Sequence, residues 1–143
     1  DVHEKYAAPV VAVFQVEGEA ISRFGVIDGE EVDAGVYKIK DMVEKPVFND
    51  APSNLAIIGR YVLTPDIFAE IEKTTPGAIG EIQITDAMRS LLRKRPFYAV
   101  RFKGTRYDAG DKLGFLIATV EFALKHEDLA PEFREYLQSL KLK

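Results

Sequence analysis

Residues 9–16, Pro-Val-Val-Ala-Val-Phe-Gln-Val, form a nearly continuous apolar run near the start of the chain. A strand that is hydrophobic at successive positions is covered on both faces, and such strands belong to parallel or mixed sheets flanked by helices. A second apolar run at 55–63 predicts another central strand. Alternation of Tyr98, Val100 and Phe102 with other residues predicts a further one. The sequence therefore predicts one mixed α/β unit.

Two more strands are expected at 25–27 and 36–43, with the acidic Asp28–Glu30 stretch as part of the connection between them. Thr64, followed by proline and an acid, is expected to cap a helix. The inward stripe of that helix is expected to contain Ile67, Phe68 and Ile71.

Three helices are expected in the rest of the chain. Thr85-Asp86 has the composition of a helix cap, and Met88, Leu91 and Leu92 follow as its inward residues. Gly110-Asp111 opens a helix that is apolar around most of its circumference, which predicts burial on several sides. A last amphipathic helix begins at Pro131. Residues 1–143 are thus expected to form one domain portion with a carboxy-terminal helical arm at about 111–143.

Composition excludes several classes of protein. The chain has 143 residues, 47% hydrophobic and 29% charged, as in folded domains. The balance of 23 acidic to 19 basic residues argues against a nucleic-acid partner. No apolar stretch approaches the roughly 20 residues of a membrane span, and no signal-peptide pattern opens the chain, so a cytoplasmic location is expected. The first residue, Asp1, and the polar helical start suggest a piece of something longer.

Glu44 and Lys45 place a carboxylate beside an ammonium at the end of a strand, just before Pro46. Neighbours on a regular strand point to opposite faces, so the two share a ligand only where the strand ends or twists. A carboxylate accepts hydrogen bonds from sugar hydroxyls, and an ammonium donates to phosphate. The alternative is an exposed ion pair worth less than about 1 kcal/mol.

Asp108 lies between an alternating strand and an apolar helix, next to the small residues Ala109 and Gly110. Ligands of open α/β sheets gather at the carboxyl ends of strands, and Mg²⁺ uses one or two carboxylates together with water and phosphates. Asp108 is therefore a candidate magnesium ligand. Alternatively, Asp108 or Asp111 only caps the following helix, for which Asp111 is the better placed.

Other candidates are weaker. Gly25 is either a place where backbone approaches a ligand or an ordinary strand-entry glycine. His3 and His126 lie in polar surroundings and are expected to be solvated. The chain has no cysteine and no Ser/His/Asp constellation, which makes acyl transfer improbable. Phosphoryl or nucleotidyl transfer needs no such nucleophile, because a phosphate oxygen can attack another phosphorus directly.

Four strings, DMVEKP (41–46), APSNLAIIGRYVLTPDIF (51–68), GEIQITDAM (80–88) and FKGTRYDAGDKLGFLIATVEFALK (102–125), resemble the bacterial UTP–glucose-1-phosphate uridylyltransferases, or UDP-glucose pyrophosphorylases. The resemblance runs from about Pro9 to Leu140, with its motifs in the family's order. It implies a Rossmann-like nucleotide-diphospho-sugar transferase fold and magnesium-dependent synthesis of UDP-glucose and pyrophosphate from UTP and glucose 1-phosphate.

The resemblance also implies roles for particular residues. Glu44 would bind glucose hydroxyls, Lys45 the sugar phosphate with a catalytic role, and Gly25 the sugar through its backbone. Asp108 would hold the metal, and the 54–61 strand would form the floor under the hexose.

The family's amino-terminal half, with its glycine-rich nucleotide loop, has no counterpart in this chain. The chain is therefore expected to be the carboxy-terminal sugar-binding half, inactive alone and partnered by the remaining half, within a homo-oligomer. Two alternatives stay open: a non-catalytic sugar-phosphate-binding or oligomerisation module, and a nucleotidyltransferase for a thymidine or guanosine nucleotide.

Overall fold

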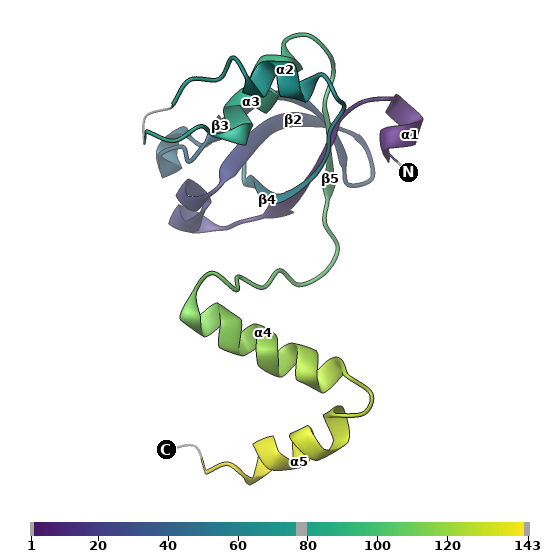
Figure 1. Cartoon of the computed structure of the whole chain (residues 1–143), viewed down its shortest axis with the longest axis vertical. Coiled ribbons are helices and arrows are strands. Elements are labelled where there is room, and N and C mark those ends of the chain that lie inside the picture. The colour runs from purple at the N-terminus through teal and green to yellow at the C-terminus, as the bar shows by residue number, and fades with distance from the viewer. Residues whose placement is uncertain (1, 77–79, 142–143) are drawn as a thin grey trace. The chain divides into compact units, whose positions relative to one another are not determined.

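The computed structural model describes residues 2–76 and 80–141 and divides into two compact units, Asp1–Phe102 and Lys103–Lys143 (Figure 1). The first unit contains the five strands that the sequence predicts, and the second contains the last two helices. The helices of the first unit are α1 (Val2–Tyr6), η1 (Gly18–Arg23, 3-10), η2 (Phe48–Asp50, 3-10), α2 (Ile67–Ile71) and α3 (Ile84–Leu92). The strands are β1 (Val10–Gln15), β2 (Gly25–Asp33), β3 (Val36–Glu44), β4 (Leu55–Val62) and β5 (Tyr98–Arg101).

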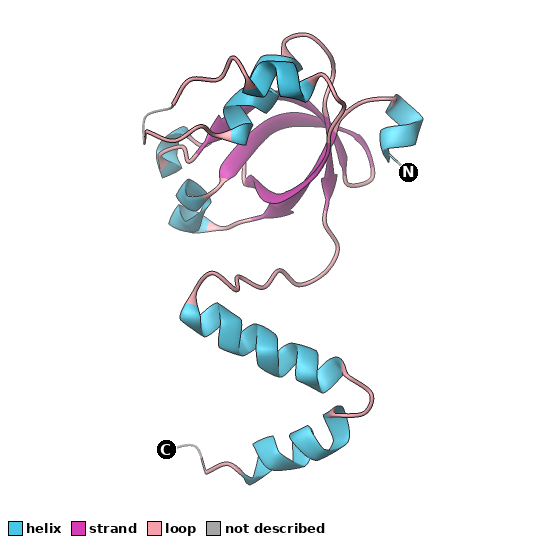
Figure 2. Ribbon diagram, in the orientation of Figure 1, coloured by secondary structure: helices cyan, strands magenta, loops and turns pink. Residues whose placement is uncertain are grey.

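The five strands close into a barrel (Figure 2). Their order around it is β1-β4-β2-β3-β5. β1 is parallel to β5 and antiparallel to β4, so that Val11 lies between Ala99 on one side and Tyr61 on the other. The remaining neighbours are antiparallel, and β2 meets β4 at Val26↔Ala56. The prediction of a mixed sheet with helices is confirmed, and closure of the sheet leaves its strands paired rather than open at an edge.

The main core fills the barrel and the space beneath α3. Val11 and Val13 of β1 are fully buried, which confirms that this strand is central. Met88 and Leu91 of α3 belong to the same cluster of buried side chains, and α3 packs against β3. The helix thus covers the barrel by burying one stripe.

Two expectations about burial and strand bounds in this unit are wrong. Phe68 was expected to be inward, but its side chain is 67% exposed, whereas Ile67 is buried. Ile67 and Ile71 are four residues apart and share the face toward the core, whereas Phe68 lies about 100° around α2 from Ile67. Asp28–Glu30 was expected in the connection before the next strand, but it lies inside β2, where an irregularity after Asp28 keeps Gly29 paired with Ile39.

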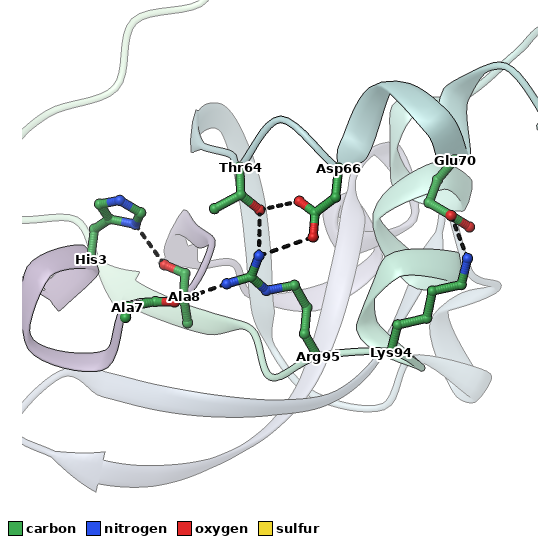
Figure 3. A network of polar contacts seen from close by, with 8 residues as sticks. All are labelled: His3, Ala7, Ala8, Thr64, Asp66, Glu70, Lys94 and Arg95. Atoms are coloured by element: carbon green, nitrogen blue, oxygen red, sulfur yellow. Dashed lines mark hydrogen bonds and ion pairs between the residues drawn. The ribbon is translucent and has the colours of Figure 1, made fainter.

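Arg95 fastens the start of β1 to the segment that precedes α2 (Figure 3). Its guanidinium donates to the Ala7 carbonyl at 2.9 Å, to Asp66 Oδ2 at 2.9 Å and to Thr64 Oγ1 at 3.1 Å. The Thr64 hydroxyl in turn donates to Asp66, and the expectation that Thr64 caps α2 is wrong: the N-cap is Asp66, without a side-chain cap bond.

The second unit, Lys103–Lys143, contains α4 (Lys112–Lys125) and α5 (Ala130–Ser139), which pack on each other. The sequence predicts that α4 is buried on several sides, and this prediction is wrong. The exposed apolar side chains of α4 are Leu113, Phe115, Leu116, Ile117 and Phe122. One neighbouring helix can cover only one face of α4. Within the described ranges, no helix combines the length and the apolar character needed to span a bilayer.

The buried Glu70 joins α2 to α3. Its carboxylate accepts hydrogen bonds from Ser90 Oγ at 2.6 Å and from Lys94 Nζ, and Lys73 Nζ lies 3.8 Å away. The Lys94 hydrogen bond, followed by that from Ser90, holds the pKa of Glu70 below its ordinary 4.5. A carboxylate that is better stabilised in the folded state than in the unfolded state links stability to pH.

The first prediction concerns the core. Met88→Ala is expected to lower the free energy of unfolding by about 2–5 kcal/mol, because the Met88 side chain is fully buried and its removal leaves a cavity in the core. Phe68→Ala, the control on the neighbouring helix, is expected to cost less than about 1 kcal/mol. Urea unfolding followed by far-ultraviolet circular dichroism measures both. Equal losses would contradict the placement of these two side chains.

The second prediction concerns pH. Because the folded pKa of Glu70 lies below the unfolded value, its interactions stabilise the fold above about pH 4.5 and cease to do so as the pH falls through the folded pKa. Glu70→Gln is therefore expected to lower the melting temperature at neutral pH. The difference in melting temperature between this variant and the parent chain should become smaller toward about pH 3. Glu72→Gln, at an exposed neighbour, is the control. A gap that stays constant with pH would refute the assignment.

Candidate functional site

The end of the β2–β3 pair brings together three of the four candidate residues. Gly25 and Glu44 are partners across the ladder, and Lys45 follows directly. Lys45 has a left-handed backbone (φ 46°), and its amide donates to the Phe24 carbonyl at 3.0 Å. This turn of the chain breaks the strict alternation of a strand, so Lys45 Nζ lies 3.9 Å from Glu44 Oε1.

The Glu44 carboxylate has a second neighbour that the sequence reading missed. Thr85 Oγ1 donates to Glu44 Oε2 at 2.7 Å, across 41 residues of sequence, and Thr85 is buried. The expectation that Thr85 caps a helix is wrong, because α3 begins one residue earlier and its N-cap is Gln83. The hydroxyl thus orients the carboxylate. The one sequence signal for it was its place in the GEIQITDAM string.

The absence of a side chain at Gly25 makes room for this contact. A Cβ there would lie 2.9 Å from Glu44 Oε2 and 3.3 Å from Thr85 Oγ1. A larger residue would therefore push the carboxylate and the hydroxyl away from their present positions. The backbone of Gly25 is not in the left-handed region, so its conformation does not require glycine. The close approach of these two side chains does.

Glu44 is exposed enough to meet a ligand, with 21% of its side chain accessible, and Lys45 more so, with 46%. Tyr61 of β4 stands close enough to respond to that charge. Partial burial raises the pKa of the Tyr61 hydroxyl, and the negative charge of Glu44 raises it further. Glu44 and Lys45 therefore offer one acceptor and one cation, which suits a polar ligand that bears both hydroxyls and negative charge.

Asp108, the fourth candidate, belongs to the second unit. Its Oδ2 accepts from Arg106 Nη2 at 2.9 Å and its Oδ1 from the Gly110 amide at 3.1 Å. Asp111 caps α4 as the sequence predicts, accepting from the amides of Leu113 and Gly114. Asp108 is therefore not the cap, and 40% of its side chain is exposed.

The described residues fit a metal only in part. They contain no group of three or more His, Asp or Glu side chains that together would hold an ion. Asp108 nevertheless offers the hard oxygen that Mg²⁺ prefers, and one carboxylate per chain segment is compatible with an ion that is otherwise bound by water and phosphates. Asp108 can thus supply one ligand of a shared site.

The chain is similar to several known proteins. Residues 1–123 match the family model described as nucleotidyl transferase. The chain is 46% identical over 142 residues to UTP–glucose-1-phosphate uridylyltransferase of Streptococcus pneumoniae, covering 98% of this chain and 47% of that protein. The chain thus spans about half the length of the curated relatives it matches.

Two solved structures are also similar. A crystal structure of UDP-glucose pyrophosphorylase complexed with UDP-glucose has a TM-score of 0.82 and 50% identity, covering 87% of this chain and 48% of its own. UTP-bound UGPase from Acinetobacter baumannii has a TM-score of 0.86 and 32% identity, covering 98% and 48%. With its mixed sheet and the match over residues 1–123, the chain belongs to the nucleotidyl transferase family.

Proposed function

We propose that this chain is the sugar-phosphate half of an enzyme that transfers a uridylyl group from UTP to glucose 1-phosphate, giving UDP-glucose and pyrophosphate. The observation that carries the proposal is the grouping of Gly25, Glu44 and Lys45 in a chain so similar to UDP-glucose pyrophosphorylases. The nucleotide half, absent from these 143 residues, would hold UTP, and the chain alone is expected to be inactive.

Each side chain has a role in this reaction. The Glu44 carboxylate, oriented by Thr85, accepts hydrogen bonds from glucose hydroxyls, and the Gly25 backbone lies against the sugar. The Lys45 ammonium binds the phosphate and neutralises part of its charge as its oxygen attacks the α-phosphorus of UTP. The bond from the α- to the β-phosphate breaks, and pyrophosphate leaves. No protein nucleophile is needed, so the residues contribute by positioning and by charge.

Enzymes of the nucleotidyl transferase family generally use a divalent metal ion. We assign Mg²⁺ as that ion and Asp108 as one of its ligands. When bound, the metal neutralises phosphate charge. The partners of Asp108 in this role would come from the nucleotide half and from the phosphates. We also propose a homo-oligomer in the cytoplasm, without nucleic-acid or membrane partners.

The third prediction tests Lys45 in the full-length protein. Lys45→Ala is expected to weaken glucose 1-phosphate binding by about 1.5–3 kcal/mol, or roughly 10- to 150-fold in Kd, because a charged hydrogen bond is lost. Lys38→Ala, which removes an exposed lysine of β3, the strand just before Lys45, is the matched control and should bind normally. Isothermal titration calorimetry gives both constants. Equal binding by the parent and Lys45→Ala would remove Lys45 from the site.

The fourth prediction separates positioning from direct contact. Thr85→Val keeps the shape of the side chain but removes the donor to Glu44, and it is expected to weaken glucose 1-phosphate binding by about 1–2 kcal/mol. In a Glu44→Ala background the same change should have little effect, because the group that Thr85 orients is gone. Calorimetry on the four proteins of this cycle measures the coupling. Additive effects would show that Thr85 does not act through Glu44.

A further inference from the structure

We infer that Gly114 is a positioning residue for Asp108: its lack of a side chain lets the backbone at Asp108 lie directly against the first turn of α4. The inference rests on the proposed metal role of Asp108 and extends it, because it says what fixes the backbone that carries that carboxylate. The relevant residues all lie in the second unit, between Lys103 and Lys125.

The contact at Gly114 is a backbone contact. A Cβ at this position would lie 2.0 Å from the Asp108 carbonyl oxygen and 3.0 Å from its carbonyl carbon. Real Cβ atoms essentially never lie closer than 3.0 Å to another heavy atom, and a carbonyl cannot swing away as the end of a long side chain can. Any side chain at Gly114 must therefore displace either Asp108 or the start of α4.

The cap of the helix leaves little freedom for that displacement. The Gly114 amide donates to Asp111 Oδ2 at 2.8 Å, and the Leu113 amide donates to Asp111 Oδ1 at 3.2 Å. The Gly110 amide, in the same short segment, donates to the Asp108 carboxylate. Two of these hydrogen bonds fix the first turn of α4 on Asp111, and the third fixes Gly110, the residue before Asp111, on Asp108.

The other side of Asp108 is attached further along the same helix. The ring of Tyr107 lies 5.5 Å from that of Phe122, and the Lys125 ammonium donates to the Tyr107 hydroxyl at 3.2 Å. The same ammonium lies 5.4 Å from the ring centroid. Helix α4 therefore holds Asp108 at both ends, through Gly114 on one side and Tyr107 on the other.

The sign of one substitution distinguishes this arrangement from an ordinary helical glycine. Glycine normally weakens a helix relative to alanine, so Gly114→Ala would strengthen α4 if position 114 had no other role. If Gly114 makes room for Asp108, the same change disturbs the segment despite the better helix propensity. We therefore expect Gly114→Ala to disturb the start of α4, although alanine favours a helix more than glycine does.

The first test uses the 143-residue chain and needs no metal. In ¹H–¹⁵N correlation spectra, Gly114→Ala is expected to shift the Gly110 amide resonance, as does Asp108→Asn, because both disturb the hydrogen bond between Gly110 and Asp108. Thr119→Ala also places alanine in α4 but one turn beyond this contact, and should leave that resonance in place. An unchanged Gly110 resonance in Gly114→Ala would overturn the inference.

The second test uses the full-length protein and measures Mn²⁺ binding by electron paramagnetic resonance. Groups that orient a metal ligand typically affect affinity about 10- to 100-fold, and a loss in this range is expected for Gly114→Ala but not for Thr119→Ala. Tyr107→Leu, which leaves the first turn of α4 intact, should also weaken binding and serves if Gly114→Ala fails to fold. Helical circular dichroism equal to that of the parent protein shows which variants keep α4 and α5 folded.

The outcomes separate this inference from the proposed function. If Asp108→Asn binds Mn²⁺ as tightly as the parent, the assignment of Asp108 as a metal ligand is wrong. If Asp108→Asn weakens binding while folded Gly114→Ala and Tyr107→Leu do not, the metal role stands and the positioning role of α4 is refuted.

Discussion

The first unit depends on the pairing of β1 along both of its edges. β4 runs antiparallel to it on one side and β5 parallel on the other, and this double pairing closes the sheet into a barrel. β1 can take this place because it is apolar on both faces, with Val11 and Val13 fully buried. Closure then fixes the β2–β3 pair, at whose end Gly25 and Glu44 face each other. The geometry of the candidate site is in this sense a consequence of a strand that has no polar face.

Both candidate acids use a glycine for the same physical purpose. At Gly25 the missing Cβ leaves room for the Glu44 carboxylate and the Thr85 hydroxyl, and at Gly114 it leaves room for the backbone of Asp108. The two cases differ in tolerance. The atoms near Gly25 are side-chain ends at 2.9 Å and 3.3 Å, which can move, whereas those near Gly114 are backbone atoms at 2.0 Å and 3.0 Å, which cannot do so without moving the chain.

The sequence predicts what depends on local pattern and fails where distant residues decide. All five strands and the Asp111 cap were predictable, because apolar runs and capping residues carry their own signal. The proximity of Glu44 and Lys45 was predictable, because Pro46 indicates that the strand ends at this point. Thr85 was missed as a partner of Glu44, since a threonine near a helix start looks like a cap whether or not a carboxylate stands opposite.

Exposure was the least predictable property. The sequence predicts Phe68 to be inward together with Ile67 and Ile71, yet Phe68 lies about 100° around α2 from Ile67, and the core reaches only the face of Ile67 and Ile71. The apolar circumference of α4 predicted burial that its one neighbouring helix does not provide. In both cases the burial of a side chain depends on which elements cover its face of the helix, and the residue pattern does not contain that information.

Each candidate acid also lies next to a basic side chain of the same unit. The two distances imply that separating the basic group from the acid costs a different free energy in each case. Lys45 Nζ is 3.9 Å from Glu44, both groups are partly exposed, and such a pair is worth less than about 1 kcal/mol. A sugar phosphate bound as proposed would therefore lose little binding free energy by separating the ammonium from this carboxylate. Arg106 donates to Asp108 at 2.9 Å, a charge-assisted hydrogen bond. A divalent ion bound at Asp108 as proposed would compete with this closer partner, so phosphates of the substrates would have to contribute much of its affinity.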